Sequence, residues 1–91
     1  MDIKKMFGNN VKYYRYQKKY TQERFAELTN SNTTYISDIE NGKYSVSFDK
    51  IAKFAEVLNV QVFELFIDNK SRVKLPRRVD MNKWQLVFII S

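Results

Sequence analysis

The 91-residue sequence contains no cysteine and no histidine. Without cysteine, no disulfide can cross-link the chain and no thiolate can bind zinc. The usual general base and the usual thiol nucleophile of enzyme active sites are therefore missing, and two glycines are too few for a phosphate-binding loop. We expect a protein that is not an enzyme and that needs no metal or cofactor. The lack of cysteine also fits a reducing compartment, so we expect the protein in the cytoplasm.

Long apolar runs are also missing. The longest one, residues 86–90, is far shorter than the roughly 20 residues that cross a bilayer. Residues 1–5 include two lysines and lack the apolar stretch of a secretory signal peptide. The sequence therefore predicts a soluble protein that is neither secreted nor inserted in a membrane.

The composition is that of a small globular protein with a basic end. Hydrophobic residues make up 44% of the chain and aromatic residues 15%, and this length allows one core but no second, catalytic domain. The net charge of +6 favours an anionic partner. Residues 1–67 carry ten basic and eight acidic side chains, whereas residues 68–91 carry six and two. We therefore divide the chain into a body, residues 1–67, and a basic extension, residues 68–91.

Helical patterns begin at the first residues of the body. A first helix is expected over about residues 2–18, because one apolar stripe recurs at helical steps: Ile3, Phe7, Val11 and Tyr14. Thr21 can cap a second helix, whose inner face consists of Phe25, Ala26, Leu28 and Thr29. The polar residues 30–32 then end this helix and form a turn.

A third helix is expected to begin at the capping residue Asn32 and to end at Asn41 and Gly42, which both tolerate the left-handed conformation. Ile36 and Ile39 form its buried pair. This helix is short and mostly polar, so most of its surface is available for contacts outside the core.

Two further helices complete the body. Ser47 can cap a fourth helix that ends at Asn59, and the inner face of that helix is expected to consist of Phe48, Ile51, Ala52, Ala55 and Leu58. A short fifth helix, about residues 62–67, is expected to add Phe63 and Phe66 to the core. The predicted fold class is all-α, with five helices.

Residues 21–42 combine a capped helix, a polar turn and a second short helix, an arrangement whose second helix can enter the major groove of DNA. Four polar side chains are expected on the face opposite Ile36 and Ile39: Thr33, Thr34, Ser37 and Asp38. Hydroxyls can bond several base edges, a threonine methyl can touch the thymine methyl, and a carboxylate can accept from a cytosine amine. We interpret these four side chains as candidate base contacts; the alternative is an ordinary solvated helix face.

Three segments resemble the phage repressor and Cro-like helix-turn-helix regulators. They are the Thr-Gln-Glu start at residues 21–23, the Ile-Glu-Asn-Gly end at residues 39–42, and residues 59–66. The resemblance covers about residues 8–67, and on it the chain is identified as a member of that family. It implies a repressor-like domain that binds double-stranded DNA sequence-specifically. The implied function is transcriptional repression, with a dimer bound to a palindromic operator.

The resemblance also implies roles for individual residues. Contacts to the DNA backbone are implied for Gln22, Asn32, Tyr35, Asn41, Lys43 and Tyr44. A partly buried ion pair is implied between Arg15 and Glu40, which would lock the first and third helices together.

The turn departs from the family pattern at three positions. Thr29 and Ser31 stand where relatives usually carry apolar residues, and Asn30 stands where they carry glycine. We expect the turn to pack less tightly, although asparagine still tolerates left-handed angles.

The extension ends in an alternating pattern that predicts a β-strand over residues 84–91, with one face formed by Trp84, Leu86, Phe88 and Ile90. An exposed hydrophobic strand must be covered. Pairing with the same strand of a second subunit would do so and would make a homodimer, which we favour. Folding back on the helical body and opening a longer domain are the alternatives. The basic residues at positions 72–83 fit either a DNA-contacting arm or a solvated flank.

A second function competes with the regulator. The chain could be an antitoxin or another protein-interaction module whose tail, residues 75–90, wraps a protein partner. The tail discriminates between the two functions, because a tail that orders without a partner would weaken the antitoxin interpretation.

Overall fold

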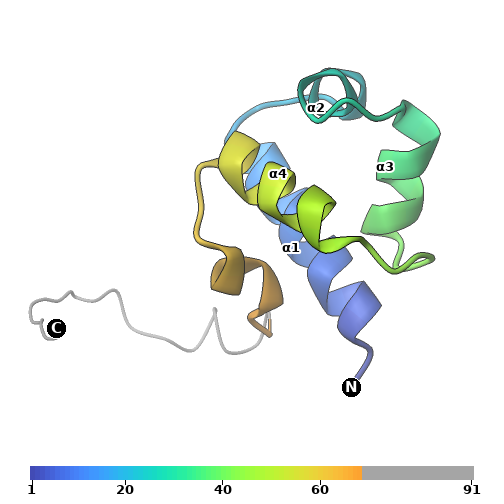
Figure 1. The fold of residues 1–91 in the computed structure, drawn as a ribbon, viewed down its shortest axis with the longest axis vertical. Helices are drawn as coiled ribbons and strands as arrows, with labels where there is room; N and C mark the ends of the chain where they lie inside the picture. The colour runs from blue at the N-terminus through green and yellow to red at the C-terminus, as the bar shows by residue number, and fades with distance from the viewer. Residues whose placement is uncertain (69–91) are drawn as a thin grey trace, which may run out of the picture.

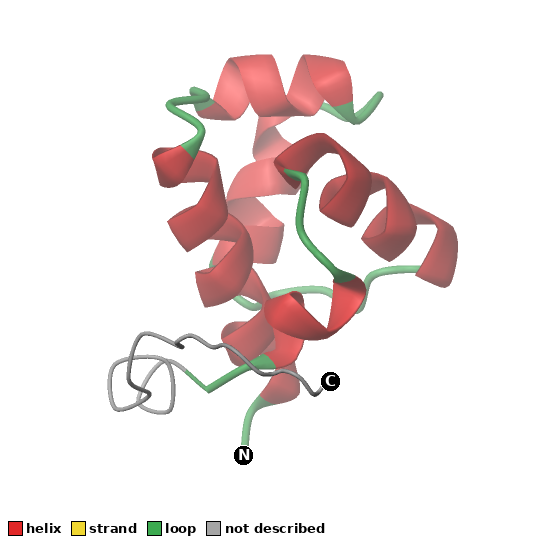
Figure 2. Cartoon of the chain, turned by 90° about the vertical axis from the view of Figure 1, so that its left-hand side faces the viewer, coloured by secondary structure: helices red, strands yellow, loops and turns green. Residues whose placement is uncertain are grey.

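The computed structural model describes residues 1–68 and contains four α-helices and one 3-10 helix (Figure 1). The elements are α1 (Ile3–Gln17), α2 (Gln22–Leu28), α3 (Thr33–Glu40), α4 (Phe48–Leu58) and η1 (Val62–Phe66). The first four helices predicted for the body are confirmed, whereas the fifth element is a 3-10 helix. Residues 1–68 form helices and loops without a strand (Figure 2). The strand predicted at residues 84–91 lies outside the described residues.

Each α-helix starts at a side chain that accepts a hydrogen bond from the backbone of its first turn. Thr21 accepts from the Arg24 amide at 3.0 Å and Asn32 from the Tyr35 amide at 2.8 Å. Asp2 and Ser47 cap α1 and α4 in the same way. The caps expected at Thr21, Asn32 and Ser47 are confirmed, because a capping oxygen satisfies a local donor and its signal is readable in sequence.

The core lies where α1 passes α3, α4 and η1. Ile36 and Ile39 of α3 are fully buried, as predicted. Phe54 of α4 lies at the centre, with its ring centroid 5.0 Å from that of Phe25 and 6.2 Å from that of Phe7. None of the helices in residues 1–68 has the length and apolar character needed to cross a membrane.

Three of the expected core positions are wrong. Phe48 is 90% exposed, Ala52 is exposed, and Phe63 is 66% exposed. On α4 the buried face is rotated toward Phe54, which is fully buried and which the expected face omitted. Phe48 is the first residue of α4 and lies beyond the edge of the core. On η1 the second half faces the core, so Leu65 is fully buried and Phe66 packs against Phe7 with ring centroids 5.2 Å apart.

Two residues of α1 set how closely its neighbours approach. Asn10 is fully buried, and its side-chain amide donates to the carbonyl oxygens of Leu65 at 3.0 Å and Ile67 at 2.8 Å. This amide therefore ties the end of η1 to α1. Gly8 is buried where α1 crosses the end of α3, and a Cβ at this position would lie 2.9 Å from the Glu40 carbonyl oxygen and would overlap that of Ile39.

We expect Gly8→Ala to destabilise the protein although alanine favours helices. The added methyl group meets backbone, which cannot move aside, and overpacking of this kind costs about 1–3 kcal/mol. Urea unfolding followed by circular dichroism measures the loss. Asn9→Ala is the control, because Asn9 is exposed on the same helix and its replacement should be neutral or slightly stabilising. A Gly8→Ala protein as stable as the control would show that α1 and α3 are not in close contact.

Candidate nucleic-acid interface

The turn between α2 and α3 is closed by backbone hydrogen bonds. The Thr29 amide donates to the Phe25 carbonyl at 3.0 Å, and the Ser31 amide donates to the Ala26 carbonyl at 2.8 Å. Asn30 lies between them with φ of 55°, in the left-handed region. The expectation that asparagine can take this conformation in place of glycine is confirmed.

The four side chains predicted to contact bases lie on α3, and only one of them is fully on its outer face. Thr34 is exposed, whereas Thr33, Ser37 and Asp38 are half-buried. The opposite face is closed, since Ile36 and Ile39 are at most 1% exposed. Thr33 and Thr34 form the first turn of α3, which is the part of a recognition helix that usually reaches base edges. The structure therefore brings the four predicted residues together on one helix.

Asp38 has a basic neighbour. The Lys43 ammonium lies 3.7 Å from the Asp38 carboxylate, and the lysine side chain is 64% exposed while the aspartate side chain is 19% exposed. Lys43 lies three residues beyond the end of α3, so it places a positive charge beside this carboxylate near the C-terminal end of the helix. The lysine therefore offsets part of the negative charge that Asp38 brings to this end of the helix.

The residues implied in backbone contacts flank α3 on both sides. Gln22 opens α2, and Tyr44 in the loop after α3 is 52% exposed. The Asn41 side-chain amide donates to the Ser37 carbonyl at 2.9 Å. The Asn32 side chain serves as the cap of α3. Tyr35 is half-buried, and desolvation by burial raises the pKa of its phenol.

Arg15 and Glu40 form a buried, two-point ion pair between α1 and α3. Arg15 Nε lies 2.6 Å from Glu40 Oε2, and Nη2 lies 3.1 Å from Oε1. The two side chains are 6% and 3% exposed. Desolvation lowers the pKa of the guanidinium, but the hydrogen bond and Coulomb attraction to Glu40 outweigh it, so the net shift is upward.

The same pair reaches the start of α2. Arg15 Nη1 donates to the Tyr20 carbonyl at 2.9 Å, and Gln22 Nε2 donates to Glu40 Oε1 at 3.1 Å. The resemblance implied the pair but not its link to Gln22. No local pattern could have shown this link, because 18 residues separate the amide from the carboxylate. Gln22, implied in binding a phosphate, is therefore oriented by the ion pair.

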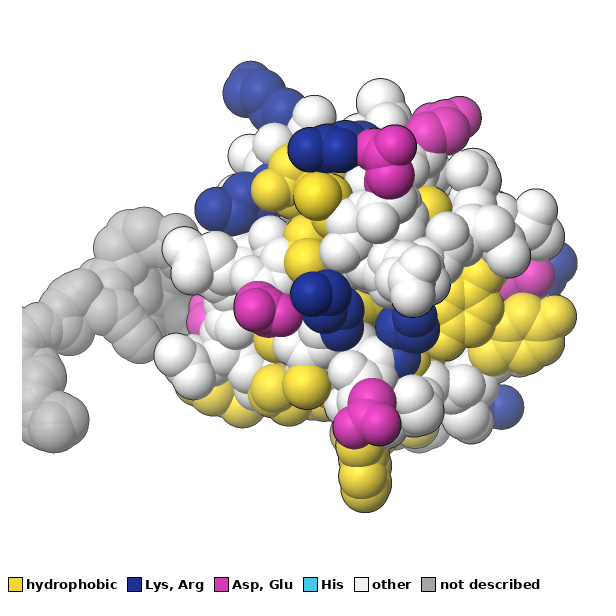
Figure 3. Space-filling view, turned by 45° about the horizontal axis from the view of Figure 1, so that its top comes forward, with side chains coloured by type: hydrophobic (Ala, Val, Ile, Leu, Met, Phe, Trp, Pro, Cys, Tyr) yellow, Lys and Arg dark blue, Asp and Glu magenta, His cyan; other side chains and the backbone are white. Residues whose placement is uncertain are grey.

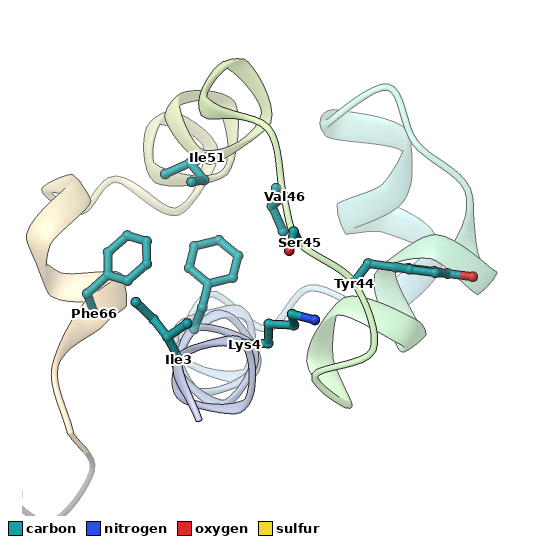
Figure 4. A pocket seen from close by; sticks show the side chains of 8 residues that line it. Ile3, Lys4, Tyr44, Ser45, Val46, Ile51 and Phe66 are labelled. Carbon is teal, nitrogen blue, oxygen red and sulfur yellow. The ribbon is translucent and has the colours of Figure 1, made fainter. Parts of the chain in front are cut away.

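A small apolar cavity of about 160 Å³ lies beside this region, between α1, the loop after α3, α4 and η1. Ile3, Phe66, Ile51 and Val46 line it, and Tyr44 lies at its edge with its hydroxyl directed away (Figure 4). The sequence patterns did not indicate it. Within residues 1–68 no group of His, Cys, Asp or Glu is placed to hold a metal ion.

Charges of both signs are interspersed on the surface. Figure 3 shows lysine, arginine and acidic side chains alternating on the face it presents, without a large patch of one sign. Residues 1–68 carry ten basic and nine acidic side chains. On the face that Figure 3 shows, the described part of the chain therefore has no broad basic surface.

Comparison with known proteins matches residues 11–65 to a family described as Helix-turn-helix. Control protein C.MunI of Mycoplasma sp is 43% identical over 68 residues, which are 74% of this chain and 92% of that protein. The restriction-modification controller protein C.AhdI from Aeromonas hydrophila aligns with a TM-score of 0.66 and 32% identity, over 69% of this chain and 91% of that chain. The master regulator for biofilm formation SinR, in complex with DNA, aligns with a TM-score of 0.62 and 32% identity, over 67% and 98%.

We expect Glu40→Ala to lower the free energy of unfolding by about 3 kcal/mol or more, because it leaves the Arg15 guanidinium buried without its carboxylate. Urea unfolding measures the change. Glu27→Ala is the matched control, since Glu27 pairs with Arg24 at 2.7 Å but the side chains are 71% and 56% exposed. Such exposed pairs contribute about 0–1 kcal/mol. Equal, small losses in both variants would show that the buried pair does not hold α1 to α3.

Proposed function

The chain belongs to the helix-turn-helix family, and we propose that it is a sequence-specific transcriptional regulator of double-stranded DNA that acts as a repressor. Similar proteins are named a control protein, a restriction-modification controller and a regulator in complex with DNA, and none of these is named as an enzyme. A body of this size bound at a promoter would exclude other proteins from the same DNA, which is the simplest route to repression. Residues 1–67 would form the DNA-binding domain.

One observation carries the proposal: the inner face of α3 is buried in the core and its remaining surface is polar. Ile36 and Ile39 fix its orientation, and this leaves Thr33 and Thr34 at its outer, N-terminal end. In this proposal Thr33, Thr34, Ser37 and Asp38 read base edges in the major groove. A hydroxyl group can donate or accept a hydrogen bond, so it can pair with several base edges. The preferred DNA sequence would therefore depend on where α3 is held as well as on its side chains.

Contacts to phosphates would position α3 from both sides. Gln22 is the first residue of α2, Asn32 is the N-cap of α3, and Tyr35 lies in the first turn of α3. Asn41, Lys43 and Tyr44 lie at its end or in the following loop. Contacts of this kind set register and affinity, whereas base contacts set specificity.

The proposal includes a homodimer, which is supported by the alternating apolar pattern near the C-terminal end of the sequence. Trp84, Leu86, Phe88 and Ile90 alternate with other residues, and pairing such strands from two subunits would bury them around a two-fold axis. A two-fold dimer would present two copies of α3 to half-sites about 34 Å apart, or one turn of DNA. The operator would then be an inverted repeat.

Selection from random duplexes tests both parts of the proposal. We expect the purified full-length chain to enrich an inverted repeat at about 100 mM salt, and the Thr33→Ala, Thr34→Ala double variant to lose that enrichment. Both replacements remove hydroxyls but no charge. The double variant should therefore still bind an unrelated duplex at low salt as the original protein does, which shows that it is folded.

Enrichment of a single half-site would argue against the dimer, while leaving recognition by α3 intact. Binding with no enriched motif would contradict sequence-specific regulation. In that case the next experiment would be a search for a protein partner of residues 75–90.

We expect Lys43→Ala to weaken binding to the selected operator and to a scrambled duplex alike, and to reduce the slope of log affinity against log salt by about one. The physical reason is the loss of one exposed positive charge near phosphates, together with loss of the charge that balances Asp38. Lys53→Ala is the control, because Lys53 is a partly exposed lysine on α4, outside the proposed interface. A loss confined to the operator would instead assign Lys43 to a base.

A further inference from the structure

Lys50, in the first turn of α4, reaches the turn between α2 and α3. Its ammonium donates to the Thr29 carbonyl at 3.0 Å, to the Ser31 hydroxyl at 3.1 Å and to the Asn30 carbonyl at 3.4 Å. The same ammonium lies 5.8 Å from the centre of the Tyr35 ring. A half-buried lysine of α4 thus contacts three of the four residues, 29–32, that connect α2 and α3.

The acceptors are groups that need a partner. The last carbonyls of a helix have no partner within that helix and carry its partial negative charge. Thr29 is the C-cap of α2 and Asn30 follows it with left-handed backbone angles. A lysine ammonium has three donors and no acceptor, so it matches three oxygens at this point. The ring of Tyr35 adds a favourable face for the cation.

The hydroxyls of the turn are arranged around the same point. Thr29 Oγ1 donates to the Phe25 carbonyl at 2.8 Å and lies 3.2 Å from Ser31 Oγ. Ser31 Oγ lies 3.2 Å from the Thr29 carbonyl. Thr29 and Ser31 are the positions where the chain departs from the apolar pattern of its family. The polar residues that were expected to loosen the turn therefore form a hydrogen-bonded cluster with Lys50.

We propose that Lys50 is a positioning residue for DNA recognition. It holds residues 29–31 in place, and these residues lead directly into Asn32 and the first turn of α3. Lys50 thereby determines where Thr33 and Thr34 meet the bases, without contacting DNA itself. This inference rests on the proposed function, since it assumes that α3 reads a specific sequence.

The exact position of a side chain matters more for a contact to a base than for a contact to a phosphate. A base contact fails when a side chain is displaced by about half an ångström, because its geometry is fixed at both ends. An exposed lysine on a flexible stem follows a phosphate over a larger distance. Loosening the turn should therefore reduce discrimination between sequences while leaving sequence-independent binding in place.

Lys50→Met tests the proposal, since methionine keeps an unbranched apolar stem and removes the ammonium. We expect affinity for the operator selected by the original protein to fall about tenfold or more, as expected for the loss of one or two base contacts. Affinity for a scrambled duplex of the same length, and the salt slope on both duplexes, should be unchanged. Thermal unfolding by circular dichroism shows that the variant is folded at the assay temperature.

Two further variants sharpen the test. Lys53→Met removes a lysine one turn along α4 that pairs with Glu56 at 3.4 Å, and it should change neither affinity. Ser31→Ala keeps the charge of Lys50 and removes one of its three acceptors, so it should produce a smaller loss of the same kind. This variant keeps the test meaningful if Lys50→Met does not fold.

Two results would overturn the inference. Unchanged discrimination in both Lys50→Met and Ser31→Ala would show that the turn holds its position without the cluster. An equal loss on both duplexes, with a salt slope smaller by about one, would show that Lys50 binds a phosphate directly. Failure of the original protein to prefer any sequence would be a different outcome, because it would refute the proposed function on which the inference rests.

Discussion

The arrangement of the helices depends on the buried contact between Arg15 and Glu40. The guanidinium holds the carboxylate at two points and the Tyr20 carbonyl at a third, while the carboxylate also accepts from Gln22. A buried ion pair contributes little net stability, because desolvation offsets most of the attraction. What it supplies is geometry, since these hydrogen bonds join α1, α3 and the start of α2 at one point.

The two ends of α3 are held by different means. At the C-terminal end, Glu40 is bound by Arg15 and the backbone lies against Gly8 of α1, which leaves no room for a side chain. At the N-terminal end, Asn32 caps the helix and Lys50 binds the turn before it. The middle is fixed by Ile36 and Ile39 in the core. A helix that is held at both ends and along one face can present its remaining face in a constant position.

Sequence patterns predicted those features whose cause is local. The caps at Thr21, Asn32 and Ser47 and the left-handed Asn30 depend only on residues within a few positions. The roles of Asn10 and Lys50 could not be read in this way. Their acceptors lie more than 50 and about 20 positions away, and nothing in an amphipathic pattern says where a long or buried polar side chain will find a partner. On the inner face of α4, Ile51, Ala55 and Leu58 were predicted correctly, whereas Phe48 and Ala52 were included and Phe54 omitted, because apolar residues also occur on the exposed side of this helix.

Most of the excess positive charge lies outside the helical body that carries α3. Residues 1–68 carry ten basic and nine acidic side chains, whereas residues 69–91 carry six and one. Sequence-independent attraction to DNA scales with the number of phosphates neutralised, so the body alone has little of it. In the proposed function, a nearly neutral body would gain binding energy mainly when several short-range contacts form together, which requires DNA that fits α3. The acidic residues of the body, Asp38 among them, would then favour discrimination, because they weaken binding to every sequence that α3 does not match.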